Sequence, residues 1–447
     1  MSTGTETERD AFACVVVGGG IHGTHVTQRL LEETAVERSD LLVVDPHDRL
    51  LASFREKAKR CGMEALRSTY VQHVGTEPFD LESFAEGTGR DDELVETAAY
   101  PDRPTLDLFL DHADAVIDRK RLDDLHRRAT VEEIHPRPNA TDGVRLETTA
   151  GRVDARRCVL AIGHGDRYRR PAWATAASDA AADRIVHVWD GFDPDAPADR
   201  TVVIGGGITA VQLACALADR HAVSVVTRHP LRCARAAADP PWINWSHVER
   251  ELHRHPPGSR ARLDVVDRAR HTATVPPYLH DELAERRDAG SLSVVRGTVA
   301  SARRLEDGVA LRLRDGTVMT ADRAVLATGF EPPFDHPFVD RLSAELGLVR
   351  GARGTPVLDD DTLAWRRTDG TVAPVHVTGA LALATVGPYA PNVPGAKRAG
   401  DRIVAAINRA LDGSAIDRPT SVAGDPRTGD AESTGSDEGS AGVEALE

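Results

Sequence analysis

The chain has 447 residues and a formal net charge of −15, and hydrophobic residues make up 41% of it but aromatic residues only 4%. That length exceeds one ordinary hydrophobic core and predicts two or three domains. The acidic balance argues against nucleic acid or an anionic membrane as a partner, and we find no run of about 18 uncharged apolar residues that would indicate a membrane span.

The first predicted unit is a strand, a glycine turn, a helix and a second strand near the N-terminus. Cys14–Val17 is an apolar strand, Gly18-Gly-Gly20-Ile-His-Gly23 has the G-x-G-x-x-G spacing, and Leu41–Asp45 is the next strand. A pyrophosphate group binds where the free N–H groups of a helix N-terminus point at it, and a Cβ at the contact would block its approach. Asp45 stands where an acidic side chain accepts hydrogen bonds from a ribose. The pattern predicts a dinucleotide site at Gly18, Gly20, Gly23 and Asp45.

A polar hairpin over Arg145–Gly163 follows, with its turn near Ala150-Gly151, and it leads into the apolar strand Val159–Gly163. This hairpin predicts a β-meander whose closing strand ends at Gly163, beside the first dinucleotide site.

The second predicted unit repeats this plan. Thr201–Ile204 is a strand, Gly205-Gly-Gly207-Ile-Thr-Ala210 is the turn, and the next strand ends at Arg228 instead of an acidic residue. A carboxylate would repel the 2′-phosphate of NADPH, whereas a guanidinium pairs with it. Gly205, Gly207, Ala210 and Arg228 therefore predict a site for NADPH.

A second hairpin and a return strand complete the plan. Leu311–Gly329 predicts a hairpin with an Asp315-Gly316 turn and a closing strand that ends at Gly329. Val375–Ala380 predicts another strand, followed by a helix from about Gly395 to Leu411. We predict an α/β protein with two Rossmann-like domains, each with a β-meander, in which the NADPH domain is inserted into the first dinucleotide-binding domain. The predicted ranges are 10–165 and 330–411 for this first domain, 166–329 for the NAD(P)H domain and 412–447 for a disordered acidic tail.

These segments resemble the two-dinucleotide-binding flavoproteins, and within them the flavin-dependent monooxygenases of the N-hydroxylating kind. The resemblance covers about residues 12–411. It depends on Val17–Gly23 with Asp45, on Val203–Ala210 with Arg228, and on Ala324–Phe330, which is similar to an alanine-threonine-glycine motif followed by an aromatic residue. It implies FAD at the first turn, NADPH at the second, and oxygenation of a small amine or another soft nucleophile by O₂.

The same resemblance implies further flavin contacts. Gln72 lies in a segment that lines the flavin in such enzymes, and Gly379 and Asn392 lie where a strand end and a helix N-terminus approach the flavin pyrimidine and ribityl chain. No substrate motif of the N-hydroxylating branch is evident. Asp239–Trp245 occupies the place of a substrate-side insertion but is more typical of a packed aromatic loop, and a lone histidine such as His187 is more often structural.

Two other functions stay open from the sequence. One is an NADPH-linked flavin reductase or electron-transfer flavoprotein without oxygenation, and the other is a non-catalytic redox sensor. The five cysteines form no C-x-x-C pair, which argues against a dithiol oxidoreductase and favours a reduced cytoplasmic protein. No metal-site spacing is evident, no catalytic side chain is identified, and a homo-oligomer is compatible with the sequence.

Overall fold

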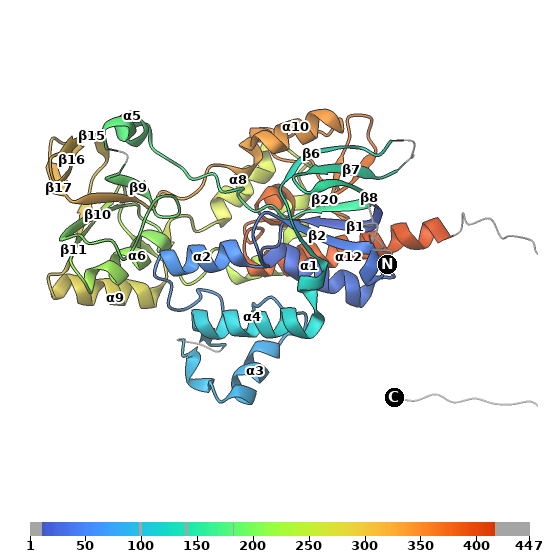
Figure 1. Cartoon of the computed structure of the whole chain (residues 1–447), viewed down its shortest axis with the longest axis horizontal. Coiled ribbons are helices and arrows are strands. Elements are labelled where there is room, and N and C mark those ends of the chain that lie inside the picture. Colours follow the sequence, from blue (N-terminus) through green and yellow to red (C-terminus); the bar gives the residue numbers. More distant parts are fainter. Residues whose placement is uncertain (1–10, 98–100, 139–141, 182, 416–447) are drawn as a thin grey trace, which may run out of the picture.

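Apolar strands followed by glycine turns form the centres of two lobes, which lie side by side along the length of the molecule (Figure 1). The computed structural model describes residues 11–97, 101–138, 142–181 and 183–415. The chain builds most of the first lobe, enters the second lobe after Gly163, and returns to the first after Gly329. The two ends of the described chain therefore belong to one lobe, which is blue and red in Figure 1, and the green and yellow lobe lies between them in sequence.

An eight-stranded sheet forms the centre of the first lobe. Its main path, in spatial order, is β19 (Ala364–Arg366), β20 (Val372–Val377), β8 (Gly151–Leu160), β1 (Ala11–Val17), β2 (Leu41–Asp45) and β5 (His126–Arg128). All neighbours from β20 to β5 are parallel, and β19 is antiparallel to β20. The predicted first meander is formed by β6 (Val131–Pro136), β7 (Val144–Thr148) and β8.

Helices cover this sheet, and its inner strands β1 and β2 are almost entirely apolar, as parallel strands buried on both faces require. The helices of the first lobe are α1 (Ile21–Glu33), α2 (Ala52–Arg60), α3 (Asp80–Thr88), α4 (Leu106–Lys120), α10 (Pro337–Glu345), α11 (Leu383–Val386) and α12 (Val393–Ala415). A small hairpin of β3 (Leu94–Val95) and β4 (Arg103–Pro104) lies before α4. Val15 and Val16 of β1 are completely buried, because both faces of the central strand are covered.

A five-stranded parallel sheet forms the centre of the second lobe. Its spatial order is β14 (Leu292–Arg296), β11 (Ala222–Thr227), β10 (Arg200–Ile204), β18 (Arg323–Leu326) and β9 (Ile185–His187). The helices and short strands of this part of the chain are α5 (Ala172–Ala181), α6 (Ile208–Ala218), β12 (Arg232–Cys233), α7 (Trp245–Val248), α8 (Arg260–Ala269), β13 (Thr274–Val275) and α9 (Pro277–Asp288). The expected α/β fold with two Rossmann-like sheets is confirmed.

The second meander is a separate three-stranded sheet. It consists of β15 (Val299–Leu305), β16 (Gly308–Leu313) and β17 (Val318–Ala321), all antiparallel. In the first lobe β8 belongs to both the meander and the parallel sheet. In the second lobe the corresponding strand is interrupted, so that β17 belongs to the meander and β18 to the parallel sheet. Asp322 occupies the break, and its carboxylate accepts hydrogen bonds from the backbone N–H groups of Asp199 (2.6 Å) and Arg200 (2.9 Å) at the start of β10.

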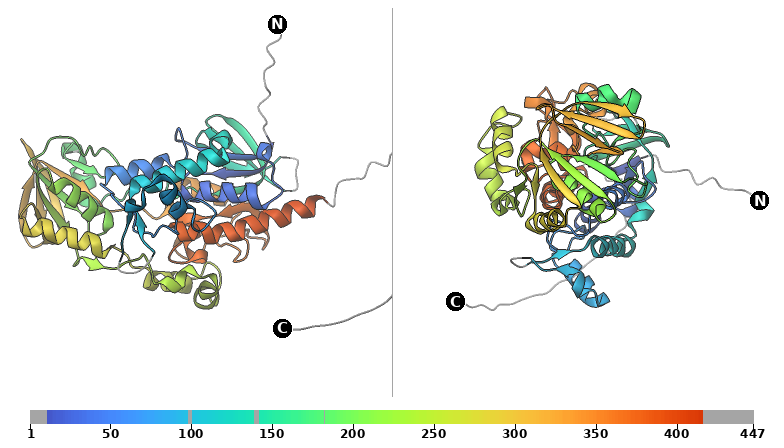
Figure 2. Two further views of the ribbon diagram at one scale, coloured as in Figure 1. Left: turned by 90° about the horizontal axis from the view of Figure 1, so that it is seen from below. Right: turned by 90° about the vertical axis from the view of Figure 1, so that its left-hand side faces the viewer.

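One segment leaves the second sheet and packs on the first lobe. The chain between β11 and β14 carries Trp242, Trp245, Val248 and Val266, which are buried in the hydrophobic core of the first lobe. Figure 2 shows these yellow-green helices along the side of the first lobe, near the red helix α12. This segment between β11 and β14, called the insertion below, therefore joins the second sheet to the core of the first lobe.

The C-terminal helix differs from its expected bounds. It begins at Val393, before Gly395, because Pro394 fits the first helical turn, where no N–H donor is needed. The helix continues to Ala415 rather than Leu411, so the prediction of a disordered tail is wrong for 412–415. The glycine in this last turn does not end the helix, because one glycine destabilises a helix by only about 1 kcal/mol. Residues 416–447 lie outside the described residues. Within the described part of the chain, no helix is long and apolar enough to cross a membrane.

Substitution of Gly23 tests the tight packing of the first turn. A Cβ on Gly23 would lie 1.8 Å from the carbonyl oxygen of Gly18, so this backbone must shift in Gly23→Ala. We expect the free energy of unfolding to fall by about 2 kcal/mol or more, the usual cost of overpacking. Gly87→Ala in α3 is the matched control, because its Cβ meets nothing within 4 Å. Equal chemical-denaturation midpoints for the two variants would contradict the packing argument.

Candidate functional site

The first glycine turn leaves a helix N-terminus open. Gly18 has φ of +108°, and a Cβ on it would lie 2.5 Å from the carbonyl oxygen of Ala161, so β1 and β8 approach each other closely here. Gly20 is the N-cap of α1 and provides no side-chain cap, and a Cβ on it would meet nothing within 4 Å. The first N–H groups of α1 thus face open space beside a positive helix end, which fits a pyrophosphate group.

Asp45 holds this turn together from the end of β2. One carboxylate oxygen accepts a hydrogen bond from the N–H of Gly19 at 2.6 Å, and the other accepts from the backbone N–H of His47 at 2.9 Å. The His47 ring nitrogen Nδ1 lies 2.7 Å from the same second oxygen. The predicted acidic residue is therefore at the turn, 8% exposed, and it orders the turn directly.

Three buried polar atoms beside the first turn lack partners among the described residues. They are Nε2 of His22 in the first turn of α1, Oε1 of Gln72 and Oδ1 of Asn392. Gly379, with φ of +71°, lies next to the His22 ring, and the other ring nitrogen of His22 lies 2.8 Å from Oγ1 of Thr378. Buried polar atoms are seldom left unpaired in native proteins, so these atoms fit contacts to a polar ring system such as that of a flavin.

Buried side chains support the loop that carries Gln72. The carbonyl oxygen of Val74 lies 3.0 Å from Nδ1 of His25 and accepts a hydrogen bond from the Gln28 amide at 3.1 Å. Lys397 of α12 donates to the carbonyl oxygen of Val71 at 2.8 Å. Burial lowers the pKa of His25 to about 4 and, aided by Arg398, that of Lys397 to about 8. The loop is therefore fixed between α1 and α12, with His25 neutral at pH 7.

The second glycine turn has the same construction. A Cβ on Gly205 would lie 2.4 Å from the carbonyl oxygen of Ala327 and 3.0 Å from the methyl group of Ala210. Ala210 is completely buried, so alanine is accommodated where the first turn has Gly23. Gly207 is the N-cap of α6 without a side-chain cap. The start of α6 is thus a second helix N-terminus available to a phosphate group.

Arg228 directly follows β11, beside this second turn. It is exposed, and no described residue forms an ion pair or side-chain hydrogen bond with it. Next to it, the Thr227 hydroxyl donates to the carbonyl oxygen of His229 at 2.9 Å and fills the place where a Cβ on Gly206 would lie. The structure therefore places an unpaired guanidinium at the strand end predicted from the sequence.

The two lobes are connected by chain segments that pair with each other. Arg169 donates its N–H to the carbonyl oxygen of Gly329 at 2.9 Å, and Glu331 donates to that of Arg167 at 2.9 Å. Gly163 and Gly329 stand at the ends of these segments with φ of +59° and +80°, and a Cβ on either would meet nothing within 4 Å. Both predicted glycines thus lie where the chain passes between the lobes.

Aromatic rings cover the paired segments. Phe330 stacks on His164 with ring centroids 4.4 Å apart and on Trp189 at 4.6 Å, and Tyr168 stacks on His187 at 4.9 Å. Burial, aided by neighbouring positive charge, lowers the pKa values of His164 and His187 to about 4. These two histidines are therefore neutral at pH 7. His187 is completely buried, and its Nε2 has no partner among the described residues.

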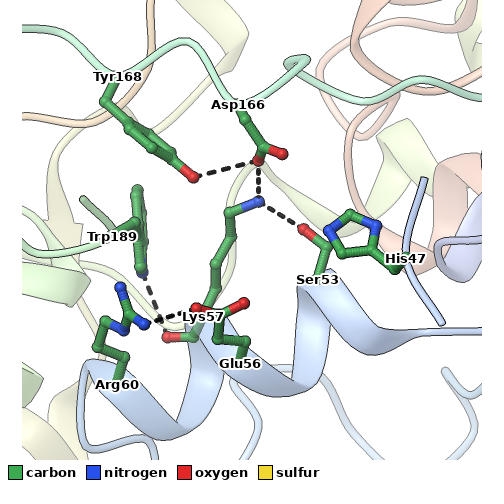
Figure 3. A pocket seen from close by; sticks show the side chains of 8 residues that line it. All are labelled: His47, Ser53, Glu56, Lys57, Arg60, Asp166, Tyr168 and Trp189. Atoms are coloured by element: carbon green, nitrogen blue, oxygen red, sulfur yellow. Dashed lines mark hydrogen bonds and ion pairs between the residues drawn. The ribbon is translucent and has the colours of Figure 1, made fainter. Parts of the chain in front are cut away.

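A polar pocket lies beside this aromatic cluster (Figure 3). Lys57 of α2 forms an ion pair with Asp166 in the connecting segment and donates to the Ser53 hydroxyl at 2.5 Å. Tyr168 donates to the same Asp166 carboxylate at 3.2 Å, and the Trp189 indole N–H donates to the carbonyl oxygen of Lys57 at 3.2 Å. These contacts join α2 of the first lobe to the connecting segment and to the second lobe.

The segment Asp239–Trp245 is a packed aromatic loop, as expected. Trp242 and Trp245 are each 9% exposed, and Trp242 lies against Gly387, before the loop that carries Asn392. The Tyr389 hydroxyl forms a hydrogen bond with the carbonyl oxygen of Ala238. The insertion thus covers the Gly387–Asn392 loop.

The cysteines of the described chain form no disulfide. Cys14, Cys61, Cys158 and Cys215 are buried, which raises the pKa of each thiol, and Cys233 is exposed. Among the described residues, no group of three or more His, Cys, Asp or Glu side chains is arranged to hold a metal ion.

Several residues of this region were not identified from the sequence. In the sequence, His22 is only a variable position of the glycine motif, and no recognisable motif contains Lys57, Asp166 or His164. Their contacts join segments more than a hundred residues apart, as in the pair Lys57–Asp166. A signal was present only for His22, whose place in the first turn of α1 put it next to any bound group.

Two family models match the chain. One, described as FAD-NAD(P)-binding, matches residues 15–165, and the other, described as pyridine nucleotide-disulphide oxidoreductase, matches residues 111–382. The first includes the first glycine turn and Asp45, and the second includes the whole of the second lobe. No curated protein matches the chain by sequence.

Solved structures with the same fold include N-hydroxylating enzymes. The ornithine N-hydroxylase of Kutzneria sp. 744, solved with reduced FAD, NADP⁺ and L-ornithine, has a TM-score of 0.72 at 18% identity over 90% of this chain and 100% of that one. The L-lysine 6-monooxygenase of Pseudomonas syringae has a TM-score of 0.68 at 19% identity, with the same coverages. The bacillithiol disulfide reductase of Staphylococcus aureus has a TM-score of 0.57 at 13% identity over 92% of this chain and 100% of that one.

Gly20→Val separates folding from cofactor binding. The added side chain meets open space in the protein itself, so the thermal stability of the apoprotein should stay unchanged. It would occupy the approach to the start of α1, so we expect FAD to bind at least tenfold more weakly, which is about 1.4 kcal/mol. Flavin fluorescence titration of the apoprotein measures this. Unchanged FAD affinity would show that the pyrophosphate lies elsewhere.

Proposed function

We propose that this chain, which belongs to the pyridine nucleotide-disulphide oxidoreductase family, is an NADPH-dependent monooxygenase that acts on a small amine or another soft nucleophile. The coarser assignment is given by the family models: the chain is a flavin-dependent NAD(P)H oxidoreductase. The proposal depends mainly on the two open glycine turns, one in each lobe. The segments that connect the two lobes are hydrogen-bonded to each other.

FAD would lie at the first turn. In this proposal Gly18, Gly20 and Gly23 allow the pyrophosphate to reach α1, and Asp45 accepts from the adenosine ribose while it orders the turn. The buried atoms of His22, Gln72 and Asn392, together with the backbone near Gly163 and Gly379, would contact the flavin and its ribityl chain. The proposed FAD domain is 10–165 and 330–411, and the proposed NAD(P)H domain is 166–329.

NADPH would lie at the second turn. Gly205, Gly207 and Ala210 would admit its pyrophosphate to the start of α6, Arg228 would pair with the 2′-phosphate, and Gly329 would leave room for the nicotinamide half between the lobes. An unpaired, exposed arginine retains its full capacity for a bidentate phosphate contact. This is why we favour NADPH over NADH.

The space between the two turns would be the reaction site. FAD supplies the chemistry when bound, namely hydride acceptance and activation of O₂. The chain itself provides binding and exclusion of water: the aromatic cluster of His164, Trp189 and Phe330 covers the connecting segments, and the loop of Trp242 covers the flavin side. The low pKa values of His164 and His187 keep these rings uncharged, so they add no positive charge near a developing charge on the substrate.

The alternative is a flavin reductase that passes electrons to another acceptor. The bacillithiol disulfide reductase shows that the same fold is found in a protein named for that reaction class. In the present chain the four buried thiols have raised pKa values, and thiolates are the reactive form in disulfide exchange. This favours oxygenation over transfer of electrons through a protein dithiol.

Rapid mixing tests the oxygenation step. The FAD-loaded protein is reduced anaerobically with NADPH and then mixed with oxygenated buffer. We expect the absorbance of oxidised flavin to reappear only after a delay of seconds or longer. The reason is that retained NADP⁺ and a covered site would keep water away from the flavin after it has reacted with oxygen. Immediate reoxidation with one hydrogen peroxide released per NADPH would contradict the monooxygenase proposal and favour the reductase.

Arg228→Ala tests the coenzyme preference. Loss of a charge-assisted phosphate contact costs about 1.5–3 kcal/mol, so the KM for NADPH should rise at least tenfold while the KM for NADH stays within about twofold. Steady-state reduction of an artificial acceptor measures both. Arg220→Ala, an exposed arginine at the far end of α6 that pairs with Asp195, is the control. Equal effects of Arg228→Ala on both coenzymes would refute the phosphate contact.

A further inference from the structure

A second cavity lies between the lobes, away from both glycine turns. It measures about 200 Å³ and is lined from the first lobe by Gly62, Glu64 and Arg103, and from the second by α6 and α9. Gln212 of α6 lines it five residues after Gly207, about 7.5 Å along the helix axis. The cavity therefore borders the flank of the helix whose start forms the second turn, and it is built equally by both lobes.

One end of the cavity is cationic. Arg103 is 8% exposed, and its guanidinium lies 3.5 Å from the centre of the Tyr278 ring. Arg103 also donates a long hydrogen bond, 3.4 Å, to the carbonyl oxygen of Leu66. Among the described residues no carboxylate forms an ion pair with Arg103, and burial lowers its pKa. A buried guanidinium without a carboxylate partner retains N–H donors for an anionic group.

The other end is acidic. Glu282 lies one helical turn after Tyr278 on the same face of α9, and Glu64 faces it from the first lobe. Burial raises the pKa of Glu282, and the negative charge of Glu64 adds to this, while Arg286 offsets it. Arg286 pairs with Glu282 at 3.0 Å but also with Asp219 at 3.2 Å, so its charge is shared. Glu64 has no ion pair within the described residues.

Polar groups on the walls are left without partners. Gln212 is 5% exposed; its amide oxygen is 3.9 Å from the Cys61 sulfur, and its amide nitrogen forms no hydrogen bond with a described residue. The Tyr278 hydroxyl is buried and has the Arg103 guanidinium as a polar neighbour. Proteins rarely leave such groups unpaired, so the cavity is suited to a polar ligand rather than an apolar one.

We propose that this cavity is a binding site for a small zwitterion, with a primary ammonium group between Glu64 and Glu282 and a carboxylate at Arg103. A ligand with only one charge would leave the opposite end of the cavity unpaired, which disfavours a simple anion, cation or metal ion. Because the two ends belong to different lobes, the bound molecule bridges them. The site is separate from the proposed FAD and NADPH sites and does not depend on the oxygenation proposal.

Calorimetric titration of the FAD-loaded protein with 5-aminopentanoate tests this proposal. This probe carries one ammonium and one carboxylate, whereas pentylamine and pentanoate each lack one of them. We expect 5-aminopentanoate to bind at least tenfold more tightly than either, with unchanged affinity when NADP⁺ is saturating. No binding of 5-aminopentanoate, or equal binding of pentylamine, would overturn the zwitterion site. Displacement by NADP⁺ would assign the binding to the nicotinamide site instead.

Two pairs of variants locate the binding. Glu282→Gln should weaken 5-aminopentanoate at least tenfold, whereas Glu285→Gln, on the exposed side of the same helix, should leave it unchanged. Gln212→Leu removes the unpaired amide and should also weaken binding, and its thermal stability shows whether it folds. Unchanged affinity in Glu282→Gln would overturn the site. All these variants should keep the wild-type rate of flavin reduction by NADPH. The binding result therefore does not depend on the oxygenation test, and either proposal can fail without the other.

Discussion

The pairing of the two connecting segments is the constraint on which the arrangement of both nucleotide turns depends. Because the second lobe is inserted into the first, the chain must cross between them twice, and the two crossings are hydrogen-bonded to each other at Arg169–Gly329 and Arg167–Glu331. The ion pair of Lys57 with Asp166 fixes one crossing to α2. A hinge of two paired strands resists twisting far more than a single linker would, so the start of α6 keeps its direction relative to the start of α1.

Several groups at the two nucleotide turns have no protein partner among the described residues. The buried guanidinium of Arg262, by contrast, is paired: it forms two hydrogen bonds of 2.6 and 2.7 Å with Asp360. The uncapped helix starts at Gly20 and Gly207 and the free atoms of Gln72 and Asn392 lie at the turns and loops that we propose hold the two nucleotides. Backbone and side-chain groups that must meet a ligand are kept free of protein partners.

Much of the fold was predictable from the sequence because its signals are local. The glycine turns, Asp45 and Arg228 occupy fixed offsets within single βαβ units, and such offsets follow from the geometry of a strand, a turn and a helix. The packing partner of the aromatic loop after β11 was not predictable, because Trp242 and Trp245 pack against a lobe that the chain re-enters only after Gly329. The contact between Arg103 and Tyr278 was not predictable either, because it joins the two lobes and no periodic pattern in the sequence indicates it.

The position of the thiols bears on where electrons leave the protein. Cys14 and Cys158 lie on the adjacent strands β1 and β8 and are completely buried, where burial opposes formation of the thiolate. Cys233, the exposed thiol, stands on β12 in the insertion, without a second exposed cysteine in the described chain to form a disulfide with it. In the proposed function, electrons would therefore pass from the flavin directly to a small molecule rather than through a protein dithiol. The aromatic cluster and the insertion that join the lobes would then also limit which small molecules reach the flavin.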